Sequence, residues 1–321
     1  MEEYDQLDLK VLAELDKDAR KPMAQMAKKI GVSGCTVANR MKSLEEKGII
    51  KRYECTTDLF RLGMKSYRIY LKLRRAGNSM EKEMMDYLCA SPLTTWCGNA
   101  GGQFDITAFL AFHDHGQAVS FWNGFLAKYR PYISRNTVVP FCGDVQSRNI
   151  FMDTNSESIA TGMEKTSVDK KDMMLLRMLT DNCRANLESM GMALGLKPAT
   201  VLYRINNLVK KGVIRAFRPV VDMNKLGYSL YKADINLAAR ANMADIEKYI
   251  LNKPGVSHIL KTIGWADIEM QAYSKTSRAL SALLHEIQDQ FPDDVQDYSF
   301  FEYFSTTKDS FAGALIENNT S

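Results

Sequence analysis

The segment GVSGCTVANRMKSLEEKGII at residues 31–50 recurs as GLKPATVLYRINNLVKKGVI at residues 195–214. Both belong to a longer match, in which residues 8–63 align with residues 172–227 without a gap, at an offset of 164 residues (172 − 8). Leucines, glycines, arginines and aspartates recur in register along it. An internal repeat fixes the number of structural units more firmly than composition does. The sequence therefore predicts two copies of one unit.

Each repeat unit extends beyond this match. GQFDITAFLAF at residues 102–112 resembles GWADIEMQAYS at residues 264–274, now at an offset of 162 residues (264 − 102). Between the copies, the polar segment at residues 153–167 is poor in large apolar side chains, which is typical of a linker. The predicted domains are a winged helix-turn-helix at 1–63, a sheet domain at 64–150, a linker at 151–167, a second winged helix-turn-helix at 168–227, a second sheet domain at 228–306 and a flexible tail at 307–321.

Composition indicates a soluble globular protein. The 321 residues suffice for two to four domains, and 45% hydrophobic with 25% charged residues is ordinary for such proteins. No apolar run approaches the ~20 residues of a membrane span. The acidic opening MEEYDQLDLK does not fit a secretory signal, so a cytoplasmic location without membrane contact is expected. The six cysteines form no CxxC pair, which favours reduced, mostly buried thiols; burial is preferred over redox sensing for Cys89 and Cys97.

The first part of each unit has the pattern of three short helices. Residues 5–15 place apolar side chains at helical spacing, Pro22 suits the start of a second helix, and Gly31 suits its C-cap. Ser33 is the expected N-cap of a third helix that runs to about Lys47. Its core face would be Val37, Met41 and Leu44. Such a helix-turn-helix inserts its third helix into the major groove of DNA. The segment at 49–63 is predicted to follow as a strand, a turn and a return strand, forming a wing.

The outward positions of the third helices and the wings are the candidate DNA contacts. Arginine binds guanine bidentately, asparagine suits adenine, and threonine suits phosphate or thymine. Copy two is more basic, because residues 204–218 carry five basic and no acidic side chains. Tyr203 replaces Asn39, and Lys197 replaces Ser33, so the two heads are expected to read different half-sites. The candidates are Ser33, Gly34, Thr36, Asn39, Arg40, Ser43, Lys51 and Arg52 in copy one, and Lys197, Thr200, Tyr203, Arg204, Asn207, Arg215 and Arg218 in copy two.

The second part of each unit alternates between strand and helix periodicity in the order β-α-β-β-α-β, the ferredoxin-like plan. The predicted fold class is therefore α+β, with two winged helix-turn-helix domains, each followed by a ferredoxin-like domain. One face of each such sheet lacks helices, and an open apolar face tends to pair with another. We therefore expect dimer-like packing, and homo-oligomers formed through these domains.

The string LDxKxLxxLxxDAR at residues 7–20, followed by IGVS, TVxxR and LExxGII, resembles the Lrp/AsnC (feast/famine) family of prokaryotic transcription regulators. The resemblance covers almost the whole chain twice and implies a covalent pseudo-dimer that binds double-stranded DNA and a small effector, commonly an amino acid. It maps the effector region onto the turn between the middle strands. The implied contacts are Gly101, Gly102, Asp105, Gly264 and Asp267; a hairpin turn capped by the aspartate is an equally weighted reading.

Two other functions are kept as alternatives. Siroheme decarboxylases resemble this two-domain family, but they would be expected to place histidine and arginine in the middle strands, where this sequence offers only His258. An amino-acid sensor without DNA binding is the second alternative, and the basic run at 204–218 argues against it. His113-Asp114-His115 is more readily a solvated turn than a metal site. We therefore expect no enzyme activity, no catalytic residues, no metal and no cofactor.

Overall fold

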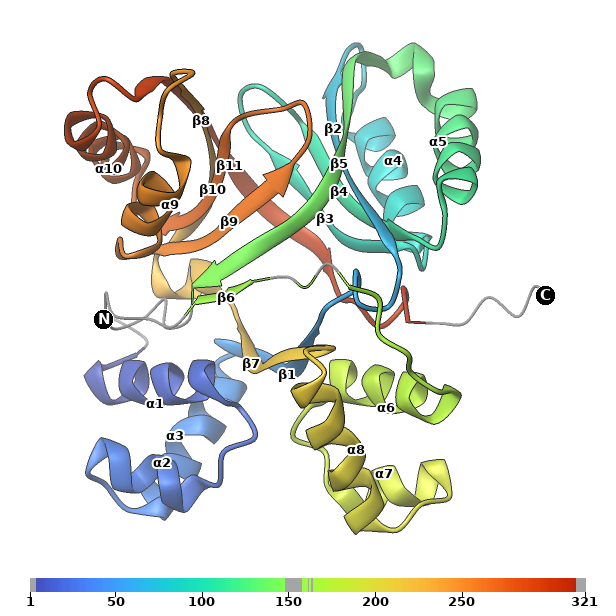
Figure 1. The fold of residues 1–321 in the computed structure, drawn as a ribbon, viewed down its shortest axis with the longest axis vertical. Helices are drawn as coiled ribbons and strands as arrows, with labels where there is room; N and C mark the ends of the chain where they lie inside the picture. Colours follow the sequence, from blue (N-terminus) through green and yellow to red (C-terminus); the bar gives the residue numbers. More distant parts are fainter. Residues whose placement is uncertain (1–3, 148–157, 161, 163, 316–321) are drawn as a thin grey trace.

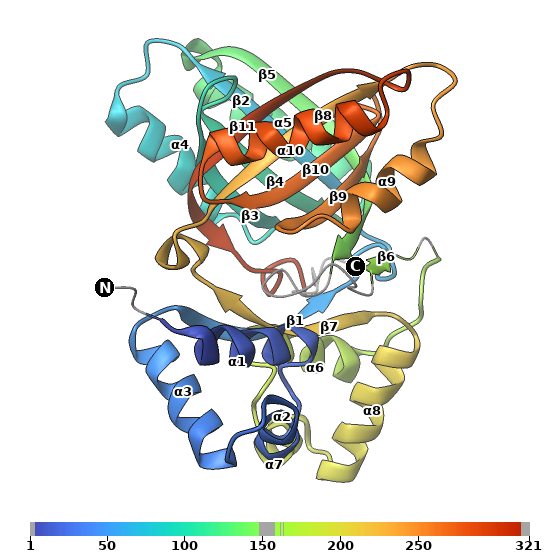
Figure 2. The ribbon, with the colours of Figure 1, turned by 90° about the vertical axis from the view of Figure 1, so that its left-hand side faces the viewer.

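The computed structural model describes residues 4–147, 158–160, 162 and 164–315. A β-barrel lies at one end of the molecule and two groups of three helices lie at the other, with a two-stranded ribbon between them (Figures 1 and 2). Both copies of the repeat contribute to each of these layers. Among the described residues, no helix combines the length and apolar composition of a membrane span.

Each helical group, called here a head, has the three predicted helices. In head one, Asp5 caps the first helix through a capping box with Asp8. Gly31 ends the second helix in the left-handed conformation at φ 84°, which glycine adopts without strain, and this confirms its predicted role. The helices are α1 (Gln6–Lys17), α2 (Met23–Ile30) and α3 (Gly34–Glu46) in head one, and α6 (Lys170–Asp181), α7 (Leu187–Leu194) and α8 (Pro198–Lys210) in head two.

The wing prediction is wrong in one respect. Strand β1 (Ile50–Thr57) has no return strand within its own copy; it pairs antiparallel with β7 (Ile214–Val221) of the other copy. Glu54 lies opposite Arg218 near the middle of this ribbon. The expected hairpin does not form, because residues 65–73 leave the head and enter the barrel instead.

The ribbon is part of a shared core between the heads. The Ala19 amide donates to the carbonyl of Phe217, and the Cys183 amide donates to the carbonyl of Tyr53, each at 2.8 Å. These two bonds are equivalent under the repeat, so each head holds the other's strand in the same way. A single buried apolar cluster runs through both heads.

The barrel is closed by strands from both copies. The strand order is β2-β4-β3-β11-β8-β10-β9-β5, and β5 pairs back to β2. The copies meet where β3 pairs with β11 and where β5 pairs with β9. Copy one supplies β2 (Lys65–Leu73), α4 (Asn78–Ala90), β3 (Thr94–Ala100), β4 (Ile106–Phe112), α5 (His115–Tyr129), the short helix η1 (Arg130–Tyr132) and β5 (Ile133–Ser147); copy two supplies η2 (Met223–Leu226), β8 (Ser229–Leu237), α9 (Met243–Leu251), β9 (Val256–Thr262), β10 (Ile268–Ser274), α10 (Ser277–Gln290) and β11 (Val295–Asp309), while β6 (Ser158–Ala160) adds to β5.

The helices cover the outside of the barrel, and the helix-free faces of the two sheets meet inside it (Figure 1). Tyr70, Phe104, Phe301 and Tyr303 fill much of this interior. The buried ammonium group of Lys232 lies there as well, ion-paired to Asp234 and to Glu269. The predicted pairing of sheet faces therefore occurs within one chain.

The predicted flexible tail is wrong for its first nine residues. Strand β11 continues to Asp309, which lies opposite Trp96. Beyond it, Ala314 and Leu315 are buried in the core shared by the heads. Apolar contacts thus hold a segment whose polar composition suggested fraying. Residues 316–321 and most of the predicted linker lie outside the described residues.

Candidate nucleic-acid interface

Helix α3 has the geometry expected of a recognition helix. Ser33 caps it, with the Thr36 amide donating to Ser33 Oγ at 3.0 Å, which confirms the predicted N-cap. Its inward face is the predicted one, and Val37, Met41 and Leu44 are buried. Asn39 is exposed, and Thr36 is half-buried. Helices α3 and α8 lie on opposite flanks of the head layer, beyond the ribbon from the barrel (Figure 2).

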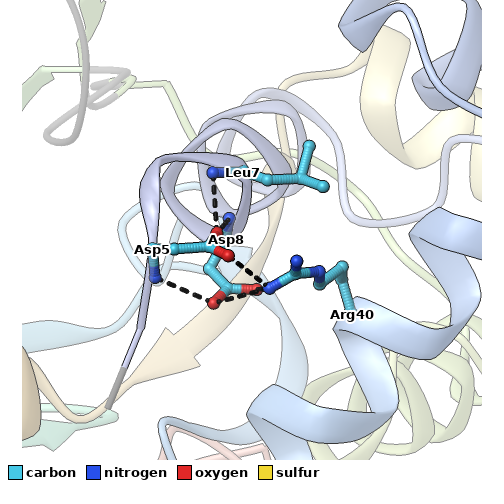
Figure 3. A network of polar contacts seen from close by, with 4 residues as sticks. All are labelled: Asp5, Leu7, Asp8 and Arg40. Atoms are coloured by element: carbon cyan, nitrogen blue, oxygen red, sulfur yellow. Dashed lines mark hydrogen bonds and ion pairs between the residues drawn. The ribbon is translucent and has the colours of Figure 1, made fainter. Parts of the chain in front are cut away.

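Arg40 does not point freely toward a ligand, contrary to the prediction. Its guanidinium lies 2.7 Å from Asp5 Oδ2 and 3.3 Å from Asp8 Oδ1, at the start of α1 (Figure 3). The hydrogen bond from the Asp8 amide lowers the pKa of Asp5, and the ion pair with Arg40 lowers it further. Arg40 therefore fixes the third helix against the capping box of the first.

Arg204 of head two repeats this arrangement. Its guanidinium lies 2.7 Å from Asp169 and 2.7 Å from Asp172, which form the capping box of α6. The two predicted base-reading arginines thus serve the same positioning role. Both arginines lie at outward positions of their helices, as predicted. However, the acidic first turn of the neighbouring helix is close enough to form ion pairs with them.

The basic residues of the ribbon are also engaged inside the chain, so the structure does not support their predicted DNA contacts. Lys51 pairs with Asp222 at 3.0 Å. The ribbon lies between the heads and the barrel (Figure 1), and the Lys51 side chain is 50% exposed. The remaining pairs are Arg52 with Glu54 at 2.6 Å, Arg215 with Asp144 at 2.7 Å and Arg218 with Asp16 at 3.6 Å, and the Arg215 and Arg218 side chains are buried.

Helix α8 presents a different surface from α3. Its N-cap, Lys197, makes no side-chain capping bond, and Pro198 occupies the first turn, where proline is well tolerated. Tyr203 is 70% exposed, and Leu202 beside it is 43% exposed. Thr200 and Asn206 are exposed, whereas the predicted Asn207 is half-buried.

Several exposed positions were missed by the sequence reasoning. Asn206 was passed over because Asn207 is the repeat counterpart of Ser43, which is also half-buried. Lys42 of α3 is 74% exposed at its side chain and pairs only weakly with Glu46, at 3.7 Å. Helical spacing from Tyr203 would have identified Asn206, which lies three positions further along.

The proposed effector residues form tight turns. Gly102 and Gly264 have φ of 82° and 81°, in the left-handed region that favours glycine, and a side chain at Gly101 would collide with the ring of Phe304. Asp105 accepts from the Leu73 amide at 2.7 Å, and Asp267 accepts from the Leu237 amide at 2.7 Å. The glycines therefore take part in the turns, and each aspartate side chain binds the end of a neighbouring strand, β2 for Asp105 and β8 for Asp267.

Two other sequence features have structural roles. Asp114, between the two histidines, caps α5 by accepting from the Gln117 amide at 2.8 Å. Cys97 is buried and Cys89 is half-buried. Cys35 is exposed on α3, on the outward side of that helix.

A family model matches the helix-turn-helix part of both copies. A model described as "Winged helix-turn-helix DNA-binding" matches residues 4–51 and 168–215. The transcriptional regulator LrpC of Bacillus subtilis is 28% identical over 145 residues, which cover 45% of this chain and 96% of LrpC. The proline dehydrogenase transcriptional activator of Rhodobacter capsulatus is 30% identical over 113 residues, covering 34% of this chain and 72% of that protein. One relative thus corresponds to about one copy.

Among solved structures, the siroheme decarboxylase NirDL matches 97% of this chain and 97% of its own chain, with a TM-score of 0.64 and 16% sequence identity. At that identity the match shows a shared fold. It extends over both heads and the barrel.

Proposed function

Because the chain belongs to the Lrp/AsnC family and contains its two-part unit twice, we propose that it is a sequence-specific regulator of transcription that binds double-stranded DNA. The observation that supports this most strongly is helix α3: N-capped, fixed by Arg40, packed on its apolar face and exposed at Asn39. A rigid recognition helix with polar residues at its outer N-terminal half is what major-groove reading requires.

We propose that one chain is a covalent pseudo-dimer, in which the two copies take the places of two subunits. The β1–β7 ribbon and the two barrel seams join the copies through backbone pairing, and they support this reading. The strand orders β5-β2-β4-β3 and β11-β8-β10-β9, each with two helices on one face, support the ferredoxin-like assignment of both sheet domains. The predicted domain boundaries after residues 63, 150, 167 and 227 belong to the same proposal. Light scattering of the purified chain would measure whether whole chains also form homo-oligomers.

The proposed DNA contacts are reduced to the outer faces of α3 and α8. They are Ser33, Gly34, Thr36, Asn39 and Ser43 in head one, with Lys197, Thr200, Tyr203 and Asn207 in head two. The two sets share only the threonine, at Thr36 and Thr200. We therefore propose that the heads read different half-sites and that the operator is asymmetric.

Selection from a random duplex library, followed by anisotropy titrations, tests this function. Asn39→Ala and Tyr203→Ala should each weaken binding by about 1–3 kcal/mol and relax specificity at different half-sites. Asn136→Ala, an exposed asparagine on the barrel strand β5, is the matched control and should bind like the wild type. Two identical selected half-sites would contradict the asymmetric operator, and absence of salt-dependent binding to any duplex would contradict DNA binding and favour a sensor that does not bind DNA.

We also propose an effector site at the turns between the middle strands of each sheet, around Gly101, Gly102 and Asp105 and around Gly264 and Asp267. The family resemblance supports it, while the hairpin role of the same residues weakens it. Titrating the twenty amino acids into the chain by calorimetry would test it. If none of the amino acids gives a heat of binding, the effector proposal is contradicted and these turns have a structural role only.

The decarboxylase alternative has a specific observation in its favour, the fold match over the whole chain. His258 is half-buried with its Nε2 3.8 Å from Asp144, and desolvation lowers the pKa of His258 to about 4. The adjoining cavity measures about 290 Å³, at the small end of the ~300–1,000 Å³ typical of ligand pockets and small for a tetrapyrrole. The absorbance of an iron tetrapyrrole titrated into the chain would reveal binding, and an unchanged spectrum would remove this alternative.

A further inference from the structure

A cavity of about 290 Å³ lies between the mouth of the barrel and the β1–β7 ribbon. Its walls come from both copies: Arg68, Phe109 and Phe141 belong to the sheet of copy one, while His258 and Gln271 belong to the sheet of copy two. Ribbon residues close it from the side of the heads. The cavity therefore exists only because the copies are joined, and it touches every layer of the molecule.

Arg68 is the unusual residue in this cavity. It is only 5% exposed, and its guanidinium carbon lies 3.8 Å from the ring centroid of Phe109 and 4.2 Å from that of Phe141. Its Nε and Nη1 have no hydrogen-bond partner among the described residues. Arginine stays protonated in proteins, so this is a permanent buried cation that lies against two aromatic faces.

The carboxylates around the cavity interact with other groups. Asp144 pairs with Arg215 at 2.7 Å, Asp16 pairs with Arg218 at 3.6 Å, and Glu54 pairs with Arg52 at 2.6 Å, as given above. In the part of the chain that the structure describes, no ion pair of Arg68 with any carboxylate is present. A buried charge without a counterion is costly, so a ligand anion is the natural partner for this guanidinium.

We propose that this cavity binds a small carboxylate with an apolar body and no amino group, and that this compound regulates the chain. The carboxylate would bind Arg68 through charge-assisted hydrogen bonds, and Phe109, Phe141 and Leu230 would pack against the apolar body. An α-ammonium group is not favoured, because it would lie close to the fixed positive charge of Arg68 in this buried site, and four of the five carboxylates that line the cavity pair with arginines. The regulatory part rests on the proposed DNA-binding function.

The position of the cavity explains how binding would reach the heads. Glu54 and Arg218, which lie opposite one another in the ribbon, both line the cavity. Each head is bonded to the ribbon strand of the other head. A ligand that prefers one placement of the ribbon against the barrel would therefore bias the relative placement of α3 and α8, which sets the half-site spacing.

The direct test uses the full chain and two probes, 3-phenylpropionate and 4-methylpentanoate, with calorimetry and thermal melting. Both should bind and raise the Tm, whereas 3-phenylpropionamide, phenylalanine and leucine should bind at least about tenfold more weakly. Arg68→Met should lose probe binding at least about tenfold. It should also melt at a higher temperature than the ligand-free wild type, because it replaces an uncompensated buried cation with an apolar side chain.

Arg135→Met is the matched control, because Arg135 also lies over an aromatic ring, at 5.2 Å from the Phe104 centroid, but is exposed. It should leave probe binding and melting unchanged. Equal binding of the acid and its amide, equal binding by Arg68→Met, or no binding of either acid would overturn the site. Preferential binding of an iron tetrapyrrole would overturn the small-ligand class.

The same experiment separates this site from the proposed function. Probe binding is measured without DNA, and DNA binding is measured without the probe. If the chain binds a carboxylate through Arg68 but binds no DNA duplex, the proposed ligand site stands and the proposed DNA-binding function is refuted. If the chain binds DNA and a carboxylate but the carboxylate does not alter DNA binding, the regulatory part is refuted. If the chain binds DNA but no carboxylate, only the ligand site is refuted.

Discussion

At the scale of single residues, the repeat preserves an arginine with a structural role, whereas the exposed position next to it differs between the copies. Arg40 and Arg204 are both retained, and both bind the capping box of the preceding head helix. Asn39 and Tyr203, one position earlier and exposed, have diverged. The arginine that fixes the helix against the preceding helix is therefore kept in both copies, while the exposed residue beside it differs.

Arg40→Ala should lower the free energy of unfolding by about 0.5–1 kcal/mol at pH 7, since the ion pairs are partly exposed. The pKa of Asp5 is lowered in the folded state, so this stabilisation is present above the ordinary carboxylate pKa and is lost as the pH falls through the lowered value. The difference from wild type should therefore begin to fall near pH 4 and disappear once the pH is below the lowered pKa of Asp5. Urea titrations at both pH values measure it, with the exposed Lys42→Ala as the control. A difference that persists at low pH would contradict the ion-pair role.

Cys35 offers a way to block one head alone. Its thiol is exposed on the first turn of α3, and its counterpart in head two is Ala199. Alkylation with N-ethylmaleimide should abolish recognition of one half-site through steric exclusion and leave the other half-site readable. Mass spectrometry confirms the modified position, and binding to duplexes that carry single half-sites measures the effect. A Cys35→Ser chain should resist the reagent; equal inhibition of that chain would refute this assignment.

At the scale of elements, the helices were predictable from the sequence and the strand partners were not. Helix bounds follow from local signals, such as Asp5, Ser33 and Gly31, which act within four residues. The partner of β1 is more than 150 residues away along the chain, and nothing local to residues 50–57 distinguishes a wing hairpin from a ribbon with the other copy. The ion pairs of Arg40 and the cavity around Arg68 depend on the same long-range placement, so periodicity could not reveal them.

The two recognition helices give a matched test of N-capping. Ser33→Ala should destabilise the chain by about 1 kcal/mol, because it removes the acceptor for the Thr36 amide. Lys197 occupies the same extended backbone region without a side-chain bond, so Lys197→Ser should stabilise by a comparable or smaller amount. Lys197→Ala should be nearly neutral. Chemical denaturation provides all three values, and a destabilising Lys197→Ser would show that Pro198 prevents a serine cap there.

At the scale of the whole molecule, the copies share their cores. Buried side chains of both heads form one apolar cluster, which also contains Ala314 and Leu315 from the end of the described chain. The barrel closes only when strands of both copies pair. Neither copy can complete a head layer or a barrel alone, so we expect the molecule to unfold as one unit.

The three tryptophans make this testable, because Trp96, Trp122 and Trp265 all lie in the barrel part of the molecule. Tryptophan fluorescence therefore reports on the barrel, while six of the ten α-helices of the described chain belong to the heads and contribute to far-ultraviolet circular dichroism. Both signals should give the same urea midpoint. Two separated midpoints would show that heads and barrel unfold independently.

The residues opposite one another in the ribbon also bear on how the gene can evolve. Glu54 and Arg218 occupy equivalent places in the repeat and lie across from each other. If copy one paired with itself, glutamate would oppose glutamate, and if copy two paired with itself, arginine would oppose arginine; like charges directly opposite are unfavourable. After the duplication, each half has thus become specialised to its sister. Deleting either half would leave a remnant poorly suited to self-association, so this fusion would be hard to reverse.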